Sequence, residues 1–78
     1  MITVKLYGLI RLDSGIRERS LDAKTVPELY SRLLAETDRI SKKDLEGCVL
    51  LVNGKVGGRR TKLADGDVVQ LLPPVAGG

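Results

Sequence analysis

Apolar and polar residues alternate at the start of the chain. Ile2, Val4 and Leu6 occupy every second position, and the residues between them are more polar. A period of two is typical of a strand with one buried face, so we expect the first strand here. Residues 16–21 alternate more weakly and predict a second strand, which the turn signal at residues 13–15 would join to the first as a hairpin.

The pattern then changes to the spacing of an amphipathic helix. Thr25, Pro27 and Glu28 form a start signal, because the threonine hydroxyl can accept the backbone N–H of Glu28 and proline costs no hydrogen bond in a first turn. We expect this helix to end near Glu36, to lie across a sheet and to be followed by a polar linker over residues 37–43. Its apolar stripe consists of Val26, Leu29, Tyr30, Leu33 and Leu34.

The second half of the chain contains further strand signals. Residues 48–52 form a continuous apolar run, and Asn53-Gly54 after it is a strong hairpin signal that leads into a brief returning strand. The last strand covers residues 68–72, and the two prolines that follow end it because proline cannot donate to a ladder. The order predicts an α+β fold, a mixed sheet of four to five strands with one main helix packed on one face.

Composition restricts the chemistry available to the chain. Its 78 residues predict one domain and include no His, no Trp, no Phe and a single cysteine, Cys48. A Ser-His-Asp or Cys-His triad, a structural zinc site and a four-thiolate cluster are therefore excluded, and we expect neither an enzyme nor a metal centre. The sequence shows no leader, no long apolar run and no internal disulfide, which favours a cytoplasmic protein away from membranes.

The last two residues are glycines. Gly77 and Gly78 lack side chains, so such an end can enter a narrow active site on another protein and present its carboxylate for chemistry. The alternative is a frayed terminus without function. The rest of the sequence has to distinguish the two interpretations.

The segment from Leu63 to Gly78 combines an Asp-Gly-Asp turn, an apolar strand, a Pro-Pro pair and a Val-x-Gly-Gly ending. Taken with the order of the elements, it resembles the ubiquitin-like sulfur-carrier family, and within it the small subunit of molybdopterin synthase. The resemblance implies a β-grasp fold, with residues 1–74 as the domain and residues 75–78 as a flexible tail. Thiamine-pathway carriers share the tail but usually lack the proline pair, so the pair favours the molybdopterin branch.

The same resemblance implies a chemical role for the tail. An ATP-dependent activating enzyme would adenylate the carboxylate of Gly78, and a sulfur donor would convert it into a thiocarboxylate. The chain would bind no cofactor and would donate this sulfur in molybdenum cofactor biosynthesis, as the non-catalytic small subunit of a heterotetramer with the large synthase subunit. Gly77 and Gly78 would be the reactive end. We expect partner contacts from Val75, Ala76, Pro73, Pro74, Leu71, Arg59, Arg60 and Lys62.

Three other functions stay open. The chain could carry sulfur for thiamine synthesis or transfer-RNA thiolation, act as a ubiquitin-like protein modifier, or serve as a non-catalytic binding module. A basic cluster at Lys55, Arg59, Arg60 and Lys62 is either a solvated loop or a docking patch for an acidic protein surface. Nucleic acid is not favoured, because the only aromatic residues are two tyrosines and they form no stacking platform.

Five further side chains each allow a structural and a functional interpretation. Cys48 could carry a persulfide, but its aliphatic neighbours favour a small apolar strand residue with a raised pKa. Tyr30 lies on the apolar stripe and is expected in the core. Val69 and Leu71, with Val56, would belong to an exposed apolar sheet face if their parity points outward, and the sequence leaves that parity open.

Overall fold

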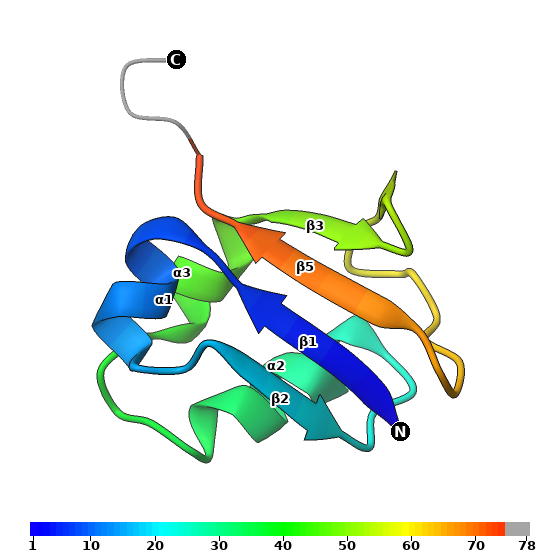
Figure 1. Cartoon of the computed structure of the whole chain (residues 1–78), viewed down its shortest axis with the longest axis horizontal. Helices are drawn as coiled ribbons and strands as arrows, with labels where there is room; N and C mark the ends of the chain where they lie inside the picture. The colour runs from blue at the N-terminus through cyan, green and yellow to red at the C-terminus, as the bar shows by residue number, and fades with distance from the viewer. Residues whose placement is uncertain (75–78) are drawn as a thin grey trace.

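The structure is a computed structural model and describes residues 1–74. Five strands form one sheet in the order β2-β1-β5-β3-β4 (Figure 1). The elements in chain order are β1 (Ile2–Leu6), α1 (Gly8–Ser14), β2 (Glu18–Leu21), α2 (Val26–Leu34), α3 (Lys42–Glu46), β3 (Val49–Val52), β4 (Lys55–Val56) and β5 (Val68–Leu72). The predicted mixed sheet is confirmed, and the described residues contain three helices where one main helix was expected.

The two central strands, β1 and β5, are parallel, whereas every other neighbouring pair is antiparallel. Parallel neighbours end at the same edge of a sheet. The segment after β1, which is α1, and the segment after β5, which begins at Pro73, therefore leave the sheet at the same end (Figure 1). We call this edge the tail end of the sheet.

Helix α2 begins as its capping pattern predicts. The Thr25 side chain accepts a hydrogen bond from the backbone N–H of Glu28 at 3.2 Å. The helix ends at Leu34, two residues before the predicted end, and crosses behind the sheet in Figure 1. Tyr30 is buried on its inner face, so the expectation that this tyrosine belongs to the core is confirmed.

Two segments that were expected to be irregular are short helices. The turn signal at residues 13–15 is the end of α1, where Gly15 adopts a φ of 75° and donates its N–H to the carbonyl of Arg11 at 3.0 Å. Helix α3 lies at the end of the predicted polar linker, and Ser41 and Asp44 form a reciprocal capping box at its start. Strands β1 and β2 do pair antiparallel as expected, but a helix joins them instead of a tight turn.

The core lies between the sheet and the helices, and β5 decides which side chains enter it. Val69 and Leu71 are fully buried there. The interpretation that places them on an exposed face is therefore wrong. Because side chains alternate along a strand, Val68, Gln70 and Leu72 point to the opposite face, which no described element covers.

The hairpin and the last turn are bound to each other. Asn53 and Gly54 have φ angles of 52° and 83°, as a two-residue hairpin of the predicted kind requires. The Asn53 amide donates to Asp67 Oδ1 at 2.9 Å, and Asp67 Oδ2 accepts the N–H of Ala64 at 2.8 Å. These two hydrogen bonds hold the pKa of Asp67 below its usual value, and the bond from Ala64 has the larger effect.

Within residues 1–74, no helix is long and apolar enough to cross a membrane.

Candidate functional site

The base of the tail is fixed by the junction between β1 and α1. The N–H of Tyr7 donates to the carbonyl of Leu71 at 3.1 Å, which extends the parallel ladder by one bond. Gly8 then lies directly against the ring of Pro73. A Cβ atom on Gly8 would be only 2.8 Å from Pro73 Cγ. The φ of Gly8 is 59°, in the left-handed region that glycine adopts readily. This close packing sets the position from which the chain leaves the sheet.

Of the predicted tail residues, the structure places the two prolines at this point. Pro73 is half-buried and Pro74 is exposed. Each proline fixes its own φ, and Pro74 also restricts the residue before it to extended conformations. The tail base is therefore a stiff exit from the sheet. The remaining predicted residues, Val75, Ala76, Gly77 and Gly78, lie outside the described residues.

The sequence contains no signal that places Gly8 beside Pro73. The two residues are far apart in the chain, and they meet only because β1 and β5 pair in parallel. An expectation of strand pairing between β1 and the last strand would have found the contact. Gly8 is the functional candidate that sequence reasoning missed.

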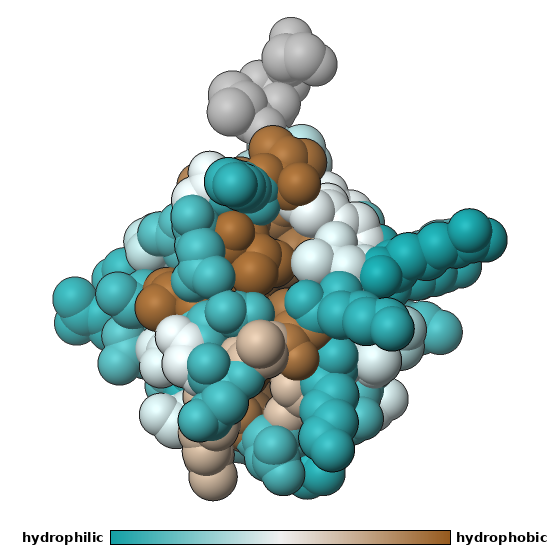
Figure 2. All heavy atoms as spheres, turned by 90° about the vertical axis from the view of Figure 1, so that its right-hand side faces the viewer, coloured by the Kyte–Doolittle hydropathy of each residue, from teal (hydrophilic) through white to brown (hydrophobic). Residues whose placement is uncertain are grey.

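Next to the tail base, the open face of the sheet carries an apolar patch. Val49 is 45% exposed and Val56 is 78% exposed. Neighbouring strands bring the members of the patch together, since Val49 pairs with Leu72 and Leu51 pairs with Val56. Figure 2 shows apolar surface exposed between hydrophilic side chains on the side of the β3–β4 hairpin. We call Val49, Leu51, Val56, Val68 and Leu72 the apolar sheet patch.

This patch replaces one predicted contact residue. Leu71 was expected to touch a partner, but it is fully buried beneath the sheet and cannot present its side chain. Its neighbour Leu72 is half-exposed on the open face and directly precedes Pro73. The apolar side chain beside the tail base is therefore that of Leu72.

Two residues of the predicted basic docking patch, Lys62 and Arg59, have different surroundings. Lys62 pairs through its backbone with Thr25, which follows β2 at the end of the sheet where Ile2 pairs with Leu21. That is the end opposite to the tail base. Arg59 is held by Glu46, with 2.6 Å between Arg59 Nη2 and Glu46 Oε2. The structure thus places Lys62 at the opposite end from the tail base, whereas Arg59 is paired with Glu46 of α3.

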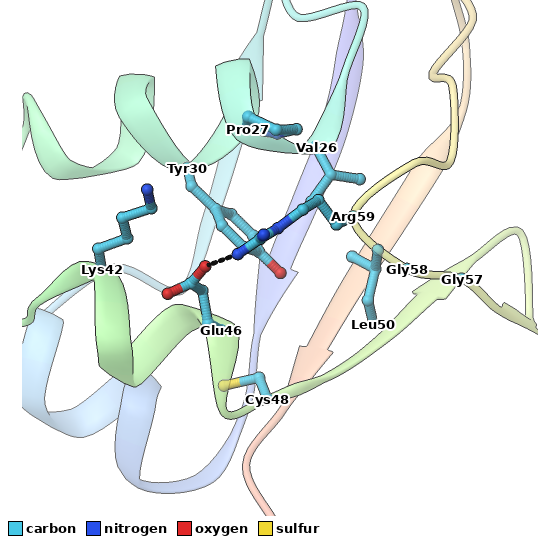
Figure 3. Close-up of a pocket in the computed structure, with 10 residues that line it drawn as sticks. All are labelled: Val26, Pro27, Tyr30, Lys42, Glu46, Cys48, Leu50, Gly57, Gly58 and Arg59. Atoms are coloured by element: carbon cyan, nitrogen blue, oxygen red, sulfur yellow. Dashed lines mark hydrogen bonds and ion pairs between the residues drawn. The ribbon is translucent and has the colours of Figure 1, made fainter.

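The described part of the chain also contains a hollow of about 260 Å³. Figure 3 shows Arg59 reaching across this hollow to Glu46, with Tyr30 and Cys48 on its walls. It opens between α2, α3, β3 and the loop after β4. The lining residues are Val26, Pro27, Tyr30, Lys42, Glu46, Cys48, Leu50, Gly57, Gly58 and Arg59.

Cys48 in this hollow behaves as a structural residue. It is partly buried against the core, and its thiol donates to the carbonyl of Asp44 at 3.3 Å. Burial, and then the nearby Asp44 carboxylate, raise the pKa of the Cys48 thiol. A raised pKa leaves the neutral, unreactive thiol dominant. Cys48 packs against the core as expected, but it lies just before β3 and not in the strand.

The strand order, the helices on one face and the exit of the chain past two prolines define a β-grasp, ubiquitin-like protein. The family model of the ThiS family matches residues 4–78, and the chain belongs to this family. It is therefore a ubiquitin-like sulfur carrier, and the predicted resemblance and the β-grasp fold are both confirmed. No curated protein sequence matches the chain.

Solved structures support the same assignment. The chain is 32% identical to a chain in the complex of subunits 1 and 2 of molybdopterin-converting factor from Helicobacter pylori 26695, covering 99% of this chain and 97% of that one, with a TM-score of 0.70. It is 27% identical to CysO of Mycobacterium tuberculosis, covering 96% and 100%, with a TM-score of 0.79. SAMP1 of Haloferax volcanii, at 23% identity and a TM-score of 0.84 over 99% and 98% of the two chains, shares the fold.

Proposed function

We propose that the chain carries sulfur as a thiocarboxylate on Gly78 and donates it in molybdopterin biosynthesis, as the small subunit of a molybdopterin synthase. The observation that carries this proposal is the 32% identity, over nearly the whole chain, to the molybdopterin-converting factor structure. The ending from the Asp-Gly-Asp turn through the proline pair to Gly-Gly supports the same branch.

The proposed chemistry begins with activation of a poor electrophile. A carboxylate oxygen of Gly78 attacks the α-phosphorus of ATP on an activating enzyme, and pyrophosphate leaves. Sulfide (HS⁻) then attacks the acyl carbon, AMP leaves with the bonding electron pair, and loss of the S–H proton leaves a thiocarboxylate. The chain supplies the carboxylate, and its partners supply the catalytic groups.

The described residues support this role through position. The Gly8–Pro73 contact fixes the tail base, so that the last residues start from a defined point on a rigid domain. Gly77 has no Cβ and accepts backbone angles that a tight channel imposes. Binding costs less when the element that presents a reactive group is already ordered.

We assign the apolar sheet patch as the surface that docks on the large synthase subunit. An exposed apolar face beside a reactive end is the kind of surface that protein interfaces bury. It adjoins the tail base through Leu72, so a partner can cover the patch and receive the tail together.

Reconstitution tests the pathway. The chain, charged with sulfur by an activating enzyme, is mixed with a large synthase subunit and the cyclic pterin precursor, and molybdopterin is measured. We expect product from the charged chain and none from a chain that lacks Gly77 and Gly78. A charged chain that forms the complex and yields no molybdopterin would refute this pathway.

Membership of the ThiS family also supports a second candidate, which is sulfur delivery to another acceptor, for example in thiamine synthesis or transfer-RNA thiolation. In that case the charged chain donates sulfur with a different acceptor protein and fails with the large synthase subunit. A ubiquitin-like modifier would leave lysine-linked adducts on cellular proteins. A binding module would keep its function without the two glycines.

A further inference from the structure

A second hollow, of about 190 Å³, lies between β1, α1 and β2. It gathers three cationic side chains around one opening. Its lining residues are Lys5, Leu6, Tyr7, Arg11, Arg17 and Glu18. We call Lys5, Arg11 and Arg17 the cationic triad.

The fold, and not the sequence, creates this triad. Its members are spaced six residues apart in a stretch that shows no basic run. The pairing of Lys5 with Glu18, and the bond of 3.0 Å from the N–H of Leu6 to the carbonyl of Arg17, bring β2 beside β1. Helix α1 closes the connection and adds Arg11. A prediction from the sequence that lacks α1 does not bring these three residues together.

The positive charge of the triad is largely uncompensated. Among residues 1–74, Glu18 is the one carboxylate that lines the hollow, and the distance of 3.9 Å between its Oε1 and Lys5 Nζ makes a long, exposed pair. Over residues 1–74, neither Arg11 nor Arg17 takes part in an ion pair. By contrast, Arg19 forms an ion pair with Glu36, with 2.7 Å between Arg19 Nε and Glu36 Oε1. Two arginines are thus free to bind an external anion.

The triad also lies at the tail end of the sheet. Tyr7, which lines the hollow, donates its N–H to Leu71, and Gly8 after it packs on Pro73. The hydroxyl of Tyr7 further accepts a hydrogen bond from Gln70 at 2.9 Å. A protein that takes the tail into its active site therefore reaches this hollow with its nearby surface.

We infer that the cationic triad docks an acidic side chain of the enzyme that activates the tail. Arginine binds a carboxylate through two parallel hydrogen bonds, which gives both attraction and orientation. Leu9 and Leu12 on α1 are 67% and 70% exposed beside Arg11, and they add the apolar contact that a protein surface offers and a free anion does not. Tyr7 alone provides no stacking row for nucleic acid.

This inference rests on the proposed function, and matched variants test the two separately. The triad variant K5Q/R11Q/R17Q and the control variant K24Q/R32Q/K43Q each lower the net charge from +3 to zero. All three control residues are exposed, and none of them lines either hollow. For each chain, the dissociation constant with the activating enzyme and the KM for ATP–pyrophosphate exchange are measured at low and high salt.

We expect the triad variant to raise the dissociation constant and KM by roughly tenfold at low salt with kcat nearly unchanged, and the control to change them less than about twofold. The difference between the two variants in dissociation constant and KM should become smaller at about 0.5 M salt, where exposed charges are screened. Equal losses in both variants would overturn the docking site, and so would saturable binding of inorganic phosphate to the triad at submillimolar concentration. A wild-type chain that binds in the expected manner but is never adenylated would refute the proposed function alone.

Discussion

Gly8 and Pro73 are in contact at the point where the chain leaves the sheet. No side chain fits between them, because a Cβ atom on Gly8 would come within 2.8 Å of Pro73 Cγ. The first loop of the domain thereby determines where the last segment starts. The relationship depends on the parallel pairing of β1 and β5, which ends both strands at the same edge.

Substitution of Gly8 by alanine tests this contact. We expect Gly8→Ala to destabilise the fold by about 3 kcal/mol, the sum of left-handed strain and overpacking against the proline ring. Gly15→Ala is the matched control, because Gly15 has a φ of 75° and open space around it. It should cost only about 1 kcal/mol in urea unfolding.

The Gly8 variant should also be charged more slowly than the Gly15 variant at a temperature where both are folded. The displaced proline ring would move the tail base, whereas a Cβ atom on Gly15 would meet no atom within 4 Å. Equal unfolding free energies and equal charging rates for the two variants would contradict the role assigned to the contact.

The two leucines at the end of β5 should differ in effect. Leu71→Ala removes a fully buried side chain and should cost about 2–5 kcal/mol of unfolding free energy. Leu72→Ala removes a half-exposed one and should cost roughly 1 kcal/mol. Leu72→Ala should instead weaken binding to the large synthase subunit. If Leu72→Ala proved the more destabilising and left binding intact, the assignment of the two faces would be reversed.

Which face of β5 is buried could not be predicted from the sequence. Alternation located β1, since its buried positions alternate with more polar ones. In β5, Val68 and Leu72 on one face are as apolar as Val69 and Leu71 on the other, so the pattern predicts a strand without an orientation. Only packing against the helices distinguishes the two faces.

The short helices were missed for a related reason. Helices of seven and five residues are too short to be stable alone and are held by packing, so their patterns are weak. Ser41 and Asp44 did offer a capping signal, though with Asp in place of the usual Glu or Gln. The cationic triad could not be predicted without α1, and the Gly8 contact could not be predicted without the parallel pairing of β1 and β5. The tail motif, by contrast, could be recognised from the sequence.

The Cys48 thiol should react slowly in the folded protein. Its pKa lies above the usual value of 9.0, mainly because the group is buried. At about pH 8 less thiolate is therefore present than in the unfolded chain, and iodoacetamide should modify the native protein more slowly than the protein in denaturant. Cys48→Ala should still accept sulfur at its C-terminus. Loss of sulfur loading in this variant would instead make Cys48 part of the chemistry.

Acid should weaken the turn that Asp67 organises. The folded pKa of Asp67 is lowered, so the stability from its hydrogen bonds is complete above the unfolded value of 3.8 and is lost as the pH falls through the folded value. Melting temperature should fall with pH below about 3.8 in the wild type. The fall should be smaller in Asp67→Asn, which cannot titrate. Parallel pH curves for the two proteins would show that another group is responsible.

Intact-protein mass spectrometry tests the central claim, that Gly78 carries sulfur. The chain is incubated with its activating enzyme, ATP and a sulfide source, and the mass of the product and of its C-terminal peptide is measured. We predict the gain that accompanies exchange of one carboxylate oxygen for sulfur, located on Gly78 and absent when ATP is omitted. A chain that keeps its mass beside an activating enzyme that is demonstrably active would contradict the claim.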